Sequence, residues 1–267
     1  MPEQAKTLLK GLHYLVSRFL LRKQYLTARA IHGITLKFKT EDAVGRYVYK
    51  HGIYEPEITR LIESVSFTYG DVFIDVGAHV GWYSILVDKL SPEGVRIFSF
   101  EPDPLNYELL KENIELNRAD KVFPINTAIG ERNGKATLYL YPDKNRGRHS
   151  LMPLHNHRTI EVGVLSLDSF IRERSITKIK LLKVDVEGYE LAVLKGARES
   201  LYIVENIILE YSPDYMIKGG INPEEFKEFL KTAPFKIFMI DSKGLIELSA
   251  HQLPEKGLQL NLLLKAC

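Results

Sequence analysis

The segment FIDVGAHVGWY, residues 73–83, carries the pattern that decides the expected fold. Residues typical of a strand end at Asp75, and Gly77 and Gly81 follow before an apolar stretch with helical spacing. A strand, a glycine turn and a helix in this order form the first half of a βαβ unit. Glycines at such a turn let the backbone approach a ligand at the strand end, where open α/β sheets bind their ligands.

Length and composition indicate a globular protein. The chain has 267 residues, 45% hydrophobic and 26% charged, which suffices for one large α/β domain with an appendage. A net charge of +2 gives no electrostatic signal for nucleic-acid binding. The single cysteine, Cys267, excludes an intrachain disulfide and a zinc site built on cysteines. The chain shows neither a membrane-spanning apolar run nor a signal-peptide pattern, so a cytoplasmic location is expected.

Strands and helices alternate along most of the chain, which predicts a doubly wound, mostly parallel sheet covered by helices on both faces. Strands are expected at 33–38, 71–76, 95–100, 121–125, 179–185 and 206–211, and helices at 53–65, 81–90, 104–117, 167–174, 189–201 and 223–231. Residues 128–165 break the alternation and predict an inserted hairpin or strands added at a sheet margin. The last two strands, near 235–240 and 257–264, lack an intervening helix, which predicts an antiparallel edge.

The N-terminal region differs from the rest. We expect residues 1–50 to form a helical cap segment beside a main domain at 51–267. Apolar residues in 4–30 recur at steps of three and four, while basic residues occupy other positions, which predicts an amphipathic helix. Its apolar face would cover its own domain or a partner subunit, or lie on an anionic membrane surface.

Two acids and two glycines describe a nucleotide site. Glu101 ends the second strand, 24 residues after Gly77, and an acid near this separation accepts hydrogen bonds from ribose hydroxyls. The turn departs from G-x-G-x-x-G because His79 replaces a glycine, and Asp75 suits a ligand with an ammonium group. S-adenosylmethionine fits, with its ribose at Glu101 and its amino-acid tail near Asp75 and the turn. The alternative is that both acids cap helices and that Gly77 and Gly81 are ordinary turn residues.

Three ordered stretches resemble the FkbM family of S-adenosylmethionine-dependent methyltransferases. They are FIDVGAHVGWYS (73–84), FSFEPDPLNYELLKENIELN (98–117) and LLKVDVEGYELAVLKGA (181–197). YEPE (54–57), TAIG (127–130) and LSLDSF (165–170) are also similar to that family. The resemblance covers about residues 33–212. It implies a Rossmann-like class I methyltransferase domain with a seven-stranded sheet, S-adenosylmethionine as cofactor, and methylation of a hydroxyl oxygen on a sugar or secondary metabolite.

The resemblance also implies cofactor-binding residues. At the first two strand ends these are Asp75, Gly77, Gly81 and Glu101. Asn126, Thr127 and Ala128 would lie beside the adenine at the end of the third strand. His79, where the family often carries Asn, alters the contact to the cofactor tail. Ser150 follows His149 in a family-like G-x-x-S pattern and is a further candidate for contact with cofactor or acceptor.

Candidate catalytic acids follow the fourth strand. Asp185 lies at its carboxyl end, next to the first strand in this architecture, which places it near the cofactor methyl group and within the cofactor site. We expect Asp185 or Glu187 to orient and deprotonate the acceptor hydroxyl. Glu210, at the end of the fifth strand, is another candidate. The alternatives are that Glu187 caps the next helix and that Glu210 is peripheral. No metal site is assigned, although strand-end carboxylates are ligands of the type that bind Mg²⁺.

The polar stretch around 142–158 supplies further candidates. His149, His155 and His157 are possible bases, and Arg146 and Arg148 suit an anionic group of the acceptor. The alternative for all of them is a solvated loop without a role.

The sequence therefore predicts an O-methyltransferase acting on a sugar, glycan or small metabolite. An RNA or nitrogen-directed methyltransferase is one alternative, disfavoured because DVEGYE (185–190) lacks the N/D-P-P-Y/F pattern. A catalytically silent binding protein is another, disfavoured by the intact acids at 75, 101 and 185. The expected partners are a small-molecule or glycan acceptor, no nucleic acid, and a membrane surface or a second copy at residues 4–30.

Overall fold

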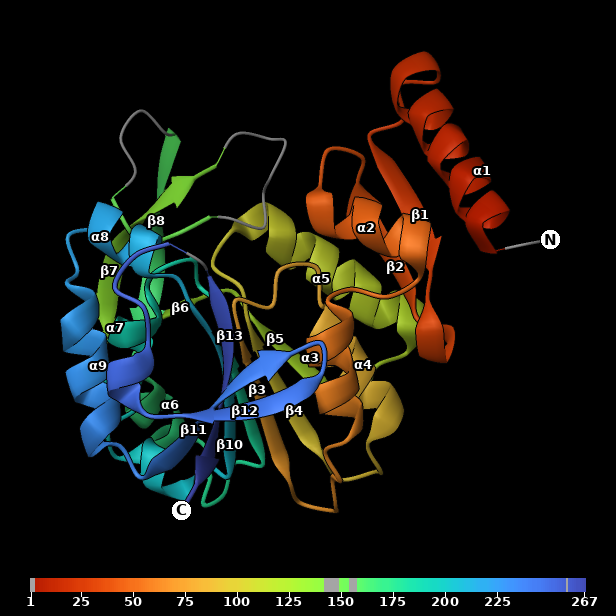
Figure 1. The fold of residues 1–267 in the computed structure, drawn as a ribbon. Helices are drawn as coiled ribbons and strands as arrows, with labels where there is room; N and C mark the ends of the chain where they lie inside the picture. Colours follow the sequence, from red (N-terminus) through yellow and green to blue (C-terminus); the bar gives the residue numbers. More distant parts are fainter. Residues whose placement is uncertain (1–2, 142–148, 154–157, 258) are drawn as a thin grey trace.

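A central eight-stranded sheet organises the protein (Figure 1). The computed structural model describes residues 3–141, 149–153, 158–257 and 259–267, with side chains from Thr7 onward. The strands of the central sheet are β3 (Val72–Val76), β4 (Arg96–Phe100), β5 (Val122–Ile125), β9 (Leu181–Val184), β10 (Asn206–Tyr211), β11 (Phe235–Asp241), β12 (Gly244–Leu248) and β13 (Leu260–Ala266). Their order is β12-β11-β13-β10-β9-β3-β4-β5.

Five neighbouring strands, from β10 to β5 in the sheet order, run parallel, whereas β13 is antiparallel to both β10 and β11. The predicted α/β class with an antiparallel edge is therefore confirmed. The strand count differs, because β12 pairs with β11 as a hairpin and adds an eighth strand. Most of β12 is exposed, so it lacks the alternation of buried residues that reveals a strand in sequence.

Helices cover both faces of the sheet (Figure 1). On one side lie α3 (Pro56–Glu63), α4 (Trp82–Leu90) and α5 (Pro104–Asn117). On the other lie α6 (Leu167–Glu173), α7 (Glu190–Lys195), α8 (Pro213–Lys218) and α9 (Pro223–Thr232). Val72, Ile74 and Val76 of β3 pack into one core cluster, and Phe73 packs into the other. This alternation explains why β3 is a continuous run of buried residues.

The strand order reverses between β3 and β9, since the chain continues from β3 to β4 on one side and reaches β9 on the other. Ligands of open α/β sheets bind at the carboxyl ends of strands at such a point. Gly77, after β3, has φ +84°, and a Cβ there would lie 2.0 Å from the carbonyl oxygen of Asp185. Only glycine lets these two strand ends approach so closely.

The inserted hairpin forms a small sheet of its own. Its strands are β6 (Ala128–Ile129), β7 (Gly134–Leu140) and β8 (Arg158–Leu165), in the order β6-β8-β7. β7 and β8 pair antiparallel, as the sequence predicted for an inserted hairpin, and a bridge joins Tyr139 to Ser150. The small sheet thereby brings the segment after residue 148 to the carboxyl edge of the main sheet.

The N-terminal 50 residues are only partly helical. Helix α1 (Glu3–Leu15) and a π turn (Val16–Leu20) are followed by β1 (Tyr25–Arg29), β2 (Thr35–Lys39) and α2 (Ala43–His51). The predicted helix over 4–30 is therefore wrong for residues 21–30, of which 25–29 form β1. Leu26 and Ala28 are buried at alternate positions while β1 pairs with β2, so strand pairing outweighs the helical spacing.

This segment shares a core with the main domain. Tyr14, Phe38 and Val48 belong to the same buried cluster as Trp82 and Ile85 of α4. The core is therefore continuous across the boundary proposed at residues 50 and 51.

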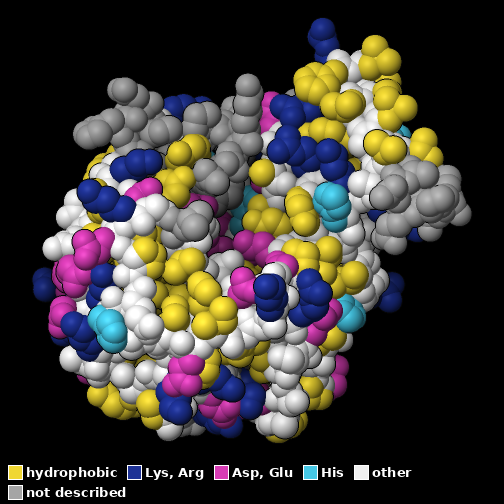
Figure 2. Space-filling view, viewed as in Figure 1, with side chains coloured by type: hydrophobic (Ala, Val, Ile, Leu, Met, Phe, Trp, Pro, Cys, Tyr) yellow, Lys and Arg dark blue, Asp and Glu magenta, His cyan; other side chains and the backbone are white. Residues whose placement is uncertain are grey.

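The apolar side of α1 faces solvent instead of its own domain. Leu8 and Leu12 of α1 and Leu20 of the π turn are 76%, 60% and 77% exposed. Figure 2 shows an apolar surface on the projecting part at its upper right. Among the described residues, no helix is long and apolar enough to cross a membrane. Contact of residues 4–30 with a membrane surface or a second copy stays a prediction.

We predict that Asn113→Ala destabilises the fold by about 3 kcal/mol. Asn113 is fully buried on α5, donates to the carbonyl oxygens of Lys37 and Val80, and accepts from the Lys37 N–H. Its loss leaves buried backbone groups of β2 without partners. Urea unfolding measures the change, with the exposed Glu115→Ala on the same helix as a control expected to shift the free energy of unfolding by less than about 0.5 kcal/mol. Equal effects of the two substitutions would contradict this assignment.

Candidate active site

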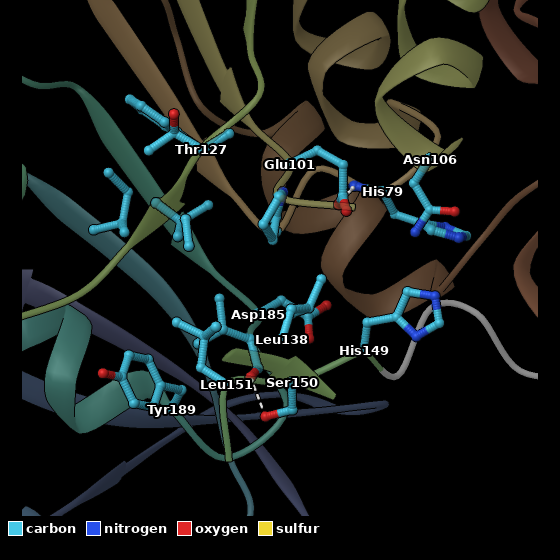
Figure 3. Close-up of a pocket in the computed structure, with 17 residues that line it drawn as sticks. His79, Glu101, Asn106, Thr127, Leu138, His149, Ser150, Leu151, Asp185 and Tyr189 are labelled. Atoms are coloured by element: carbon cyan, nitrogen blue, oxygen red, sulfur yellow. Dashed lines mark hydrogen bonds between the residues drawn. The ribbon is translucent and has the colours of Figure 1, made fainter. Parts of the chain in front are cut away.

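A cavity lies at the carboxyl ends of β3, β4 and β9 (Figure 3). Its lining includes seven residues that the sequence assigned to the cofactor: Gly77, His79, Glu101, Thr127, Ala128, Ser150 and Asp185. Asn106, Leu151 and Tyr189 complete much of the wall and were missed by the sequence analysis. These three come from helices or loops whose side chains carry no strand-end signal, so only the folded chain reveals them.

Glu101 is the principal polar group of this cavity. It is 5% exposed; its Oε2 accepts from the backbone N–H of His79 and its Oε1 from that of Asp103, both at 2.9 Å. Burial raises the pKa of Glu101 to about 8, although these two hydrogen bonds act in the opposite direction. A strand-end carboxylate held by its neighbours in this way suits two hydroxyl donors of a ribose.

The cavity is narrow. Its volume is about 40 Å³, which holds a few water molecules. His149, Ser150 and Leu151 lie across the cavity from Glu101 (Figure 3). A nucleoside is larger than this space, so its entry requires the segment 149–151 to withdraw.

Three predicted cofactor residues lie outside the cavity lining. The Asp75 side chain is 1% exposed and accepts from Ser84 Oγ at 2.6 Å. Gly81 has φ +91° at the start of α4, and a Cβ there would lie 2.6 Å from a side chain of α5. Asn126 Nδ2 donates to the carbonyl oxygen of Glu101 at 2.8 Å. None of the three lines the cavity, and their direct contact with a cofactor stays a prediction.

A second, larger cavity of about 490 Å³ adjoins the first. Gly77, His79 and Asp185 line both cavities. Asp185 therefore lies at their junction, where a group held in one cavity meets a group held in the other.

An ion pair with a buried lysine fixes Asp185. Lys183 Nζ lies 3.0 Å from Asp185 Oδ2, is 3% exposed at its side chain, and stands 4.7 Å from the centroid of the Tyr83 ring. Burial alone would lower the pKa of Lys183, but Asp185, Asp75 and Glu55 together outweigh it and raise the pKa. Lys183 is opposite Asp75 in the β3–β9 register, which puts both side chains on one face of the sheet.

Two further acids near Asp185 favour their protonated forms. Burial, reinforced by the charge of Asp185, raises the pKa of Glu55, whose carboxylate accepts from the Tyr83 hydroxyl. The same causes raise the pKa of Glu210 to about 10, and Ser212 Oγ donates to it at 2.7 Å. Asp185 is thus flanked by the ammonium group of Lys183 and by two acids whose pKa values are raised, that of Glu210 to about 10. Neither Lys183 nor Glu55 was a candidate from the sequence. A signal for Lys183 was present, because it is the one charged residue within the buried strand β9. Glu55 lies in the family-like stretch YEPE (54–57).

Glu187 lines the second cavity from a left-handed position, with φ +53°. The turn between β9 and α7 is stabilised by a different acid, Glu190. Its Oε1 accepts from the N–H groups of Val186 at 3.2 Å and Gly188 at 3.1 Å. Glu187 is therefore not needed as the helix cap. Its carbonyl oxygen accepts from Ser150 Oγ at 2.9 Å, which connects the strand-end turn to the segment opposite Glu101.

The remaining candidates divide into two groups. His149 Nε2 lies 3.3 Å from Asp103 Oδ2, and its Nδ1 accepts from the backbone N–H of Tyr141 at 2.9 Å, so its ring is fixed at the cavity wall. Arg146, Arg148, His155 and His157 lie outside the described residues. Within the described part of the chain, no three acids, histidines or cysteines are arranged to hold a metal ion.

Comparison with known families fits this geometry. The family described as "Methyltransferase FkbM domain" matches residues 75–236, more than half of the chain. The chain belongs to the FkbM methyltransferase family. The resemblance found in the sequence is thereby confirmed, and the match contains Glu101, Asp185 and Glu210 but not the N-terminal segment.

Curated relatives are similar over part of their length. The chain is 27% identical to the "Hexuronic acid methyltransferase AglP" of Haloferax volcanii over 61% of this chain and 62% of the relative. It is 27% identical to the "2-O-methyltransferase NoeI" of Sinorhizobium fredii over 65% of this chain and 78% of the relative. It is 30% identical to the "31-O-demethyl-FK506 methyltransferase FkbM" of Streptomyces tacrolimicus over 49% and 61%. The match thus spans less than two thirds of AglP and of the FK506 methyltransferase.

A solved FkbM methyltransferase from Methylobacillus flagellatus is a loose structural neighbour. It covers 81% of this chain and 49% of its own, at 17% identity and a TM-score of 0.49. The fold assignment depends instead on the strand order. In it, β13 lies between β10 and β11 and runs antiparallel to both.

We predict that the affinity for adenosine rises with pH up to about pH 8 and is constant above it. Adenosine carries no group that titrates near neutral pH, so the change reports the protein. Below its raised pKa Glu101 is protonated and accepts ribose hydrogen bonds poorly, so affinity falls by up to about tenfold per pH unit as pH decreases. Isothermal titration measures the affinity, and Glu101→Gln should bind weakly with no such pH dependence. The same pH profile in both proteins would contradict the assignment.

Proposed function

We propose that the chain is an S-adenosylmethionine-dependent O-methyltransferase acting on a hydroxyl group of a sugar, glycan or other small metabolite. The observation that carries this proposal is the position of Asp185 between a cavity with a ribose-type acceptor, Glu101, and a larger open cavity. The printed names of the relatives, which include a hexuronic acid methyltransferase and a 2-O-methyltransferase, support an oxygen acceptor on a sugar.

The first cavity would hold the cofactor, which supplies a methyl group already activated on a sulfonium. Glu101 would accept from the ribose hydroxyls, and Gly77 allows a close approach of the backbone. Thr127 and Ala128, after the third parallel strand, would line the adenine end. Asp75 would act mainly through Lys183, because its own side chain is directed into the protein.

The chain's own contribution to the chemistry is to position and deprotonate the acceptor. Asp185 would accept the hydroxyl proton, and the ammonium group of Lys183 keeps its carboxylate in place. Glu210, whose pKa is raised to about 10, can donate a hydrogen bond to the acceptor without adding negative charge beside Asp185, and burial raises the pKa of Glu55 in the same direction. Glu187 faces the same cavity and is the second candidate base.

The alternatives from the sequence find less support. A methyltransferase for amino groups of bases needs an aromatic and Pro-Pro platform that DVEGYE (185–190) does not provide. A silent binding protein has no need for a buried Lys183, which costs desolvation energy, paired with an Asp185 that faces an open cavity.

The proposal is tested by methyl transfer from labelled S-adenosylmethionine to sugars, glycan fractions, small metabolites and RNA. We expect label on a sugar or metabolite oxygen, and we expect Asp185→Asn to lower kcat by about 10²–10⁴-fold while S-adenosylhomocysteine still binds. Glu187→Gln should change kcat by less than about tenfold. Label found only in RNA or on nitrogen would contradict the proposal, and a greater loss in Glu187→Gln would move the base to Glu187.

A further inference from the structure

The acceptor cavity, the second cavity described above, has one wall that comes from the N-terminal segment. Ala43, Arg46, Tyr47 and Lys50 of α2 line it, at positions i, i+3, i+4 and i+7. This spacing puts all four side chains on one face of the helix. The wall lies outside the residues that match the FkbM family and has no role in the chemistry assigned to the strand ends.

A series of aromatic rings runs from this wall to the reacting end of the cavity. The Tyr47 ring lies 4.5 Å from that of His51 and 6.1 Å from that of Tyr54, edge to face. Tyr54 lies 6.4 Å from Tyr83, which carries Lys183 over its face. Aromatic faces with polar tips of this kind pack against flat apolar faces of ring-shaped ligands.

The charges of the cavity are separated by position. Its strand end carries four acids and one cation, Lys183, which is paired with Asp185; the acids are Glu55, Asp185, Glu187 and Glu210. The α2 wall carries Arg46 and Lys50, and neither forms an ion pair with an acid among the described residues. A ligand that crosses the cavity therefore meets an excess of carboxyl groups at one end and cations without an acidic partner at the other.

We propose that α2 forms the recognition wall for the acceptor, and that the acceptor is a ring-shaped molecule bearing an anionic substituent, a carboxylate or a phosphate. The ring would pack on Tyr47 and Tyr54, the anion would lie at Arg46 and Lys50, and the hydroxyl group would face Asp185. Naming this molecule an acceptor depends on the proposed function; its binding does not require turnover.

The single tryptophan gives a direct reporter of binding. Trp82 is the only tryptophan of the chain and lines the acceptor cavity. Its fluorescence is titrated with D-glucuronate, glucose 6-phosphate and D-glucose at fixed ionic strength. We expect at least one of the two anionic sugars to bind about tenfold more tightly than glucose, and the comparison of the two identifies the preferred anion.

The variant carrying Arg46→Gln and Lys50→Gln should reduce this preference to less than about threefold while leaving glucose binding unchanged. A matched control, Arg132→Gln with Lys243→Gln, removes the same charge from exposed sites that line no part of the cavity and should keep the preference. Equal binding of the three sugars, no saturable signal with any of them, or a preference that survives in the first variant would overturn the inference. Calorimetric binding of S-adenosylhomocysteine to the unaltered protein distinguishes failure of this inference from failure of the proposed function. Absence of that binding would count against the proposed function itself.

The exposed apolar side of α1 and the π turn is a second candidate interaction surface. Helix α1 and the π turn after it project from the body of the protein (Figure 1), and Tyr14 and Ser17 face inward. Leu8, Leu12 and Phe19 are 76%, 60% and 66% exposed on the outer side. Figure 2 shows this apolar surface on the projecting helix with dark blue basic side chains beside it.

The positive charge of this segment favours a partner with negative charge. Lys10, Arg22 and Lys23 are exposed, and no acidic residue occurs between Glu3 and Glu41. Two copies meeting through this face would oppose basic residues to basic residues, whereas an anionic bilayer offers both acyl chains and negative headgroups. We infer that α1 and its π turn lie on an anionic membrane surface, with the leucines in the interfacial region.

Co-sedimentation of the whole chain with vesicles tests this inference. We expect binding to phosphatidylcholine vesicles that contain phosphatidylglycerol, and at least about tenfold weaker binding to phosphatidylcholine alone. Leu12→Asp with Phe19→Asp should abolish binding, whereas the control Leu116→Asp with Leu245→Asp, at exposed leucines elsewhere, should not. Equal loss in both variants, no binding to anionic vesicles, or dimers in sedimentation equilibrium that the first variant dissociates would overturn it.

Discussion

An ion pair at the carboxyl end of one parallel strand, β9, is the interaction on which the site depends. Lys183 and Asp185 alternate with Val184, so both point to the face of the sheet that carries α4 and the larger cavity. Lys183 is buried, and its charge would be costly without a partner, so the pair holds Asp185 in place beside it. The negative charge of Asp185 in turn favours the protonated forms of Glu55 and Glu210. A carboxylate beside acids with raised pKa values suits the acceptance of a proton from a hydroxyl group.

The two sides of the site have different origins in the chain. The match to the FkbM family begins at residue 75 and contains the cofactor side and the strand-end acids. The acceptor wall comes from α2, and Asn113 ties the preceding strand, β2, to α5. His79 connects the two sides, since its backbone N–H binds Glu101 while its ring lies 3.6 Å from Asp42, the N-cap of α2. His79 is therefore a direct structural connection between the two sides.

The sequence predicted the central strands, the switch point and the strand-end residues Glu101 and Asp185. It could do so because buried parallel strands appear in sequence as continuous apolar runs, and the polar residue that follows such a run marks the strand end. It failed where structure depends on contacts distant in the chain. Residues 25–29 have helical spacing but pair as β1 with β2, and β12 has no buried side to mark it. Nor could the sequence show which strand-end side chains face a cavity, since Asp75 turns toward Ser84 and Lys183 instead. Glu55 precedes Asp185 by 130 residues, and only the folded chain brings the two acids near each other.

The most direct test of the central claim is an experimental structure with bound S-adenosylhomocysteine. We predict that the ribose hydroxyls donate to Glu101, that the segment 149–151 withdraws from its present position, and that the sulfur atom faces the junction occupied by Asp185. A ribose bound away from Glu101, or a sulfur atom separated from Asp185 by the protein's own side chains, would contradict the account.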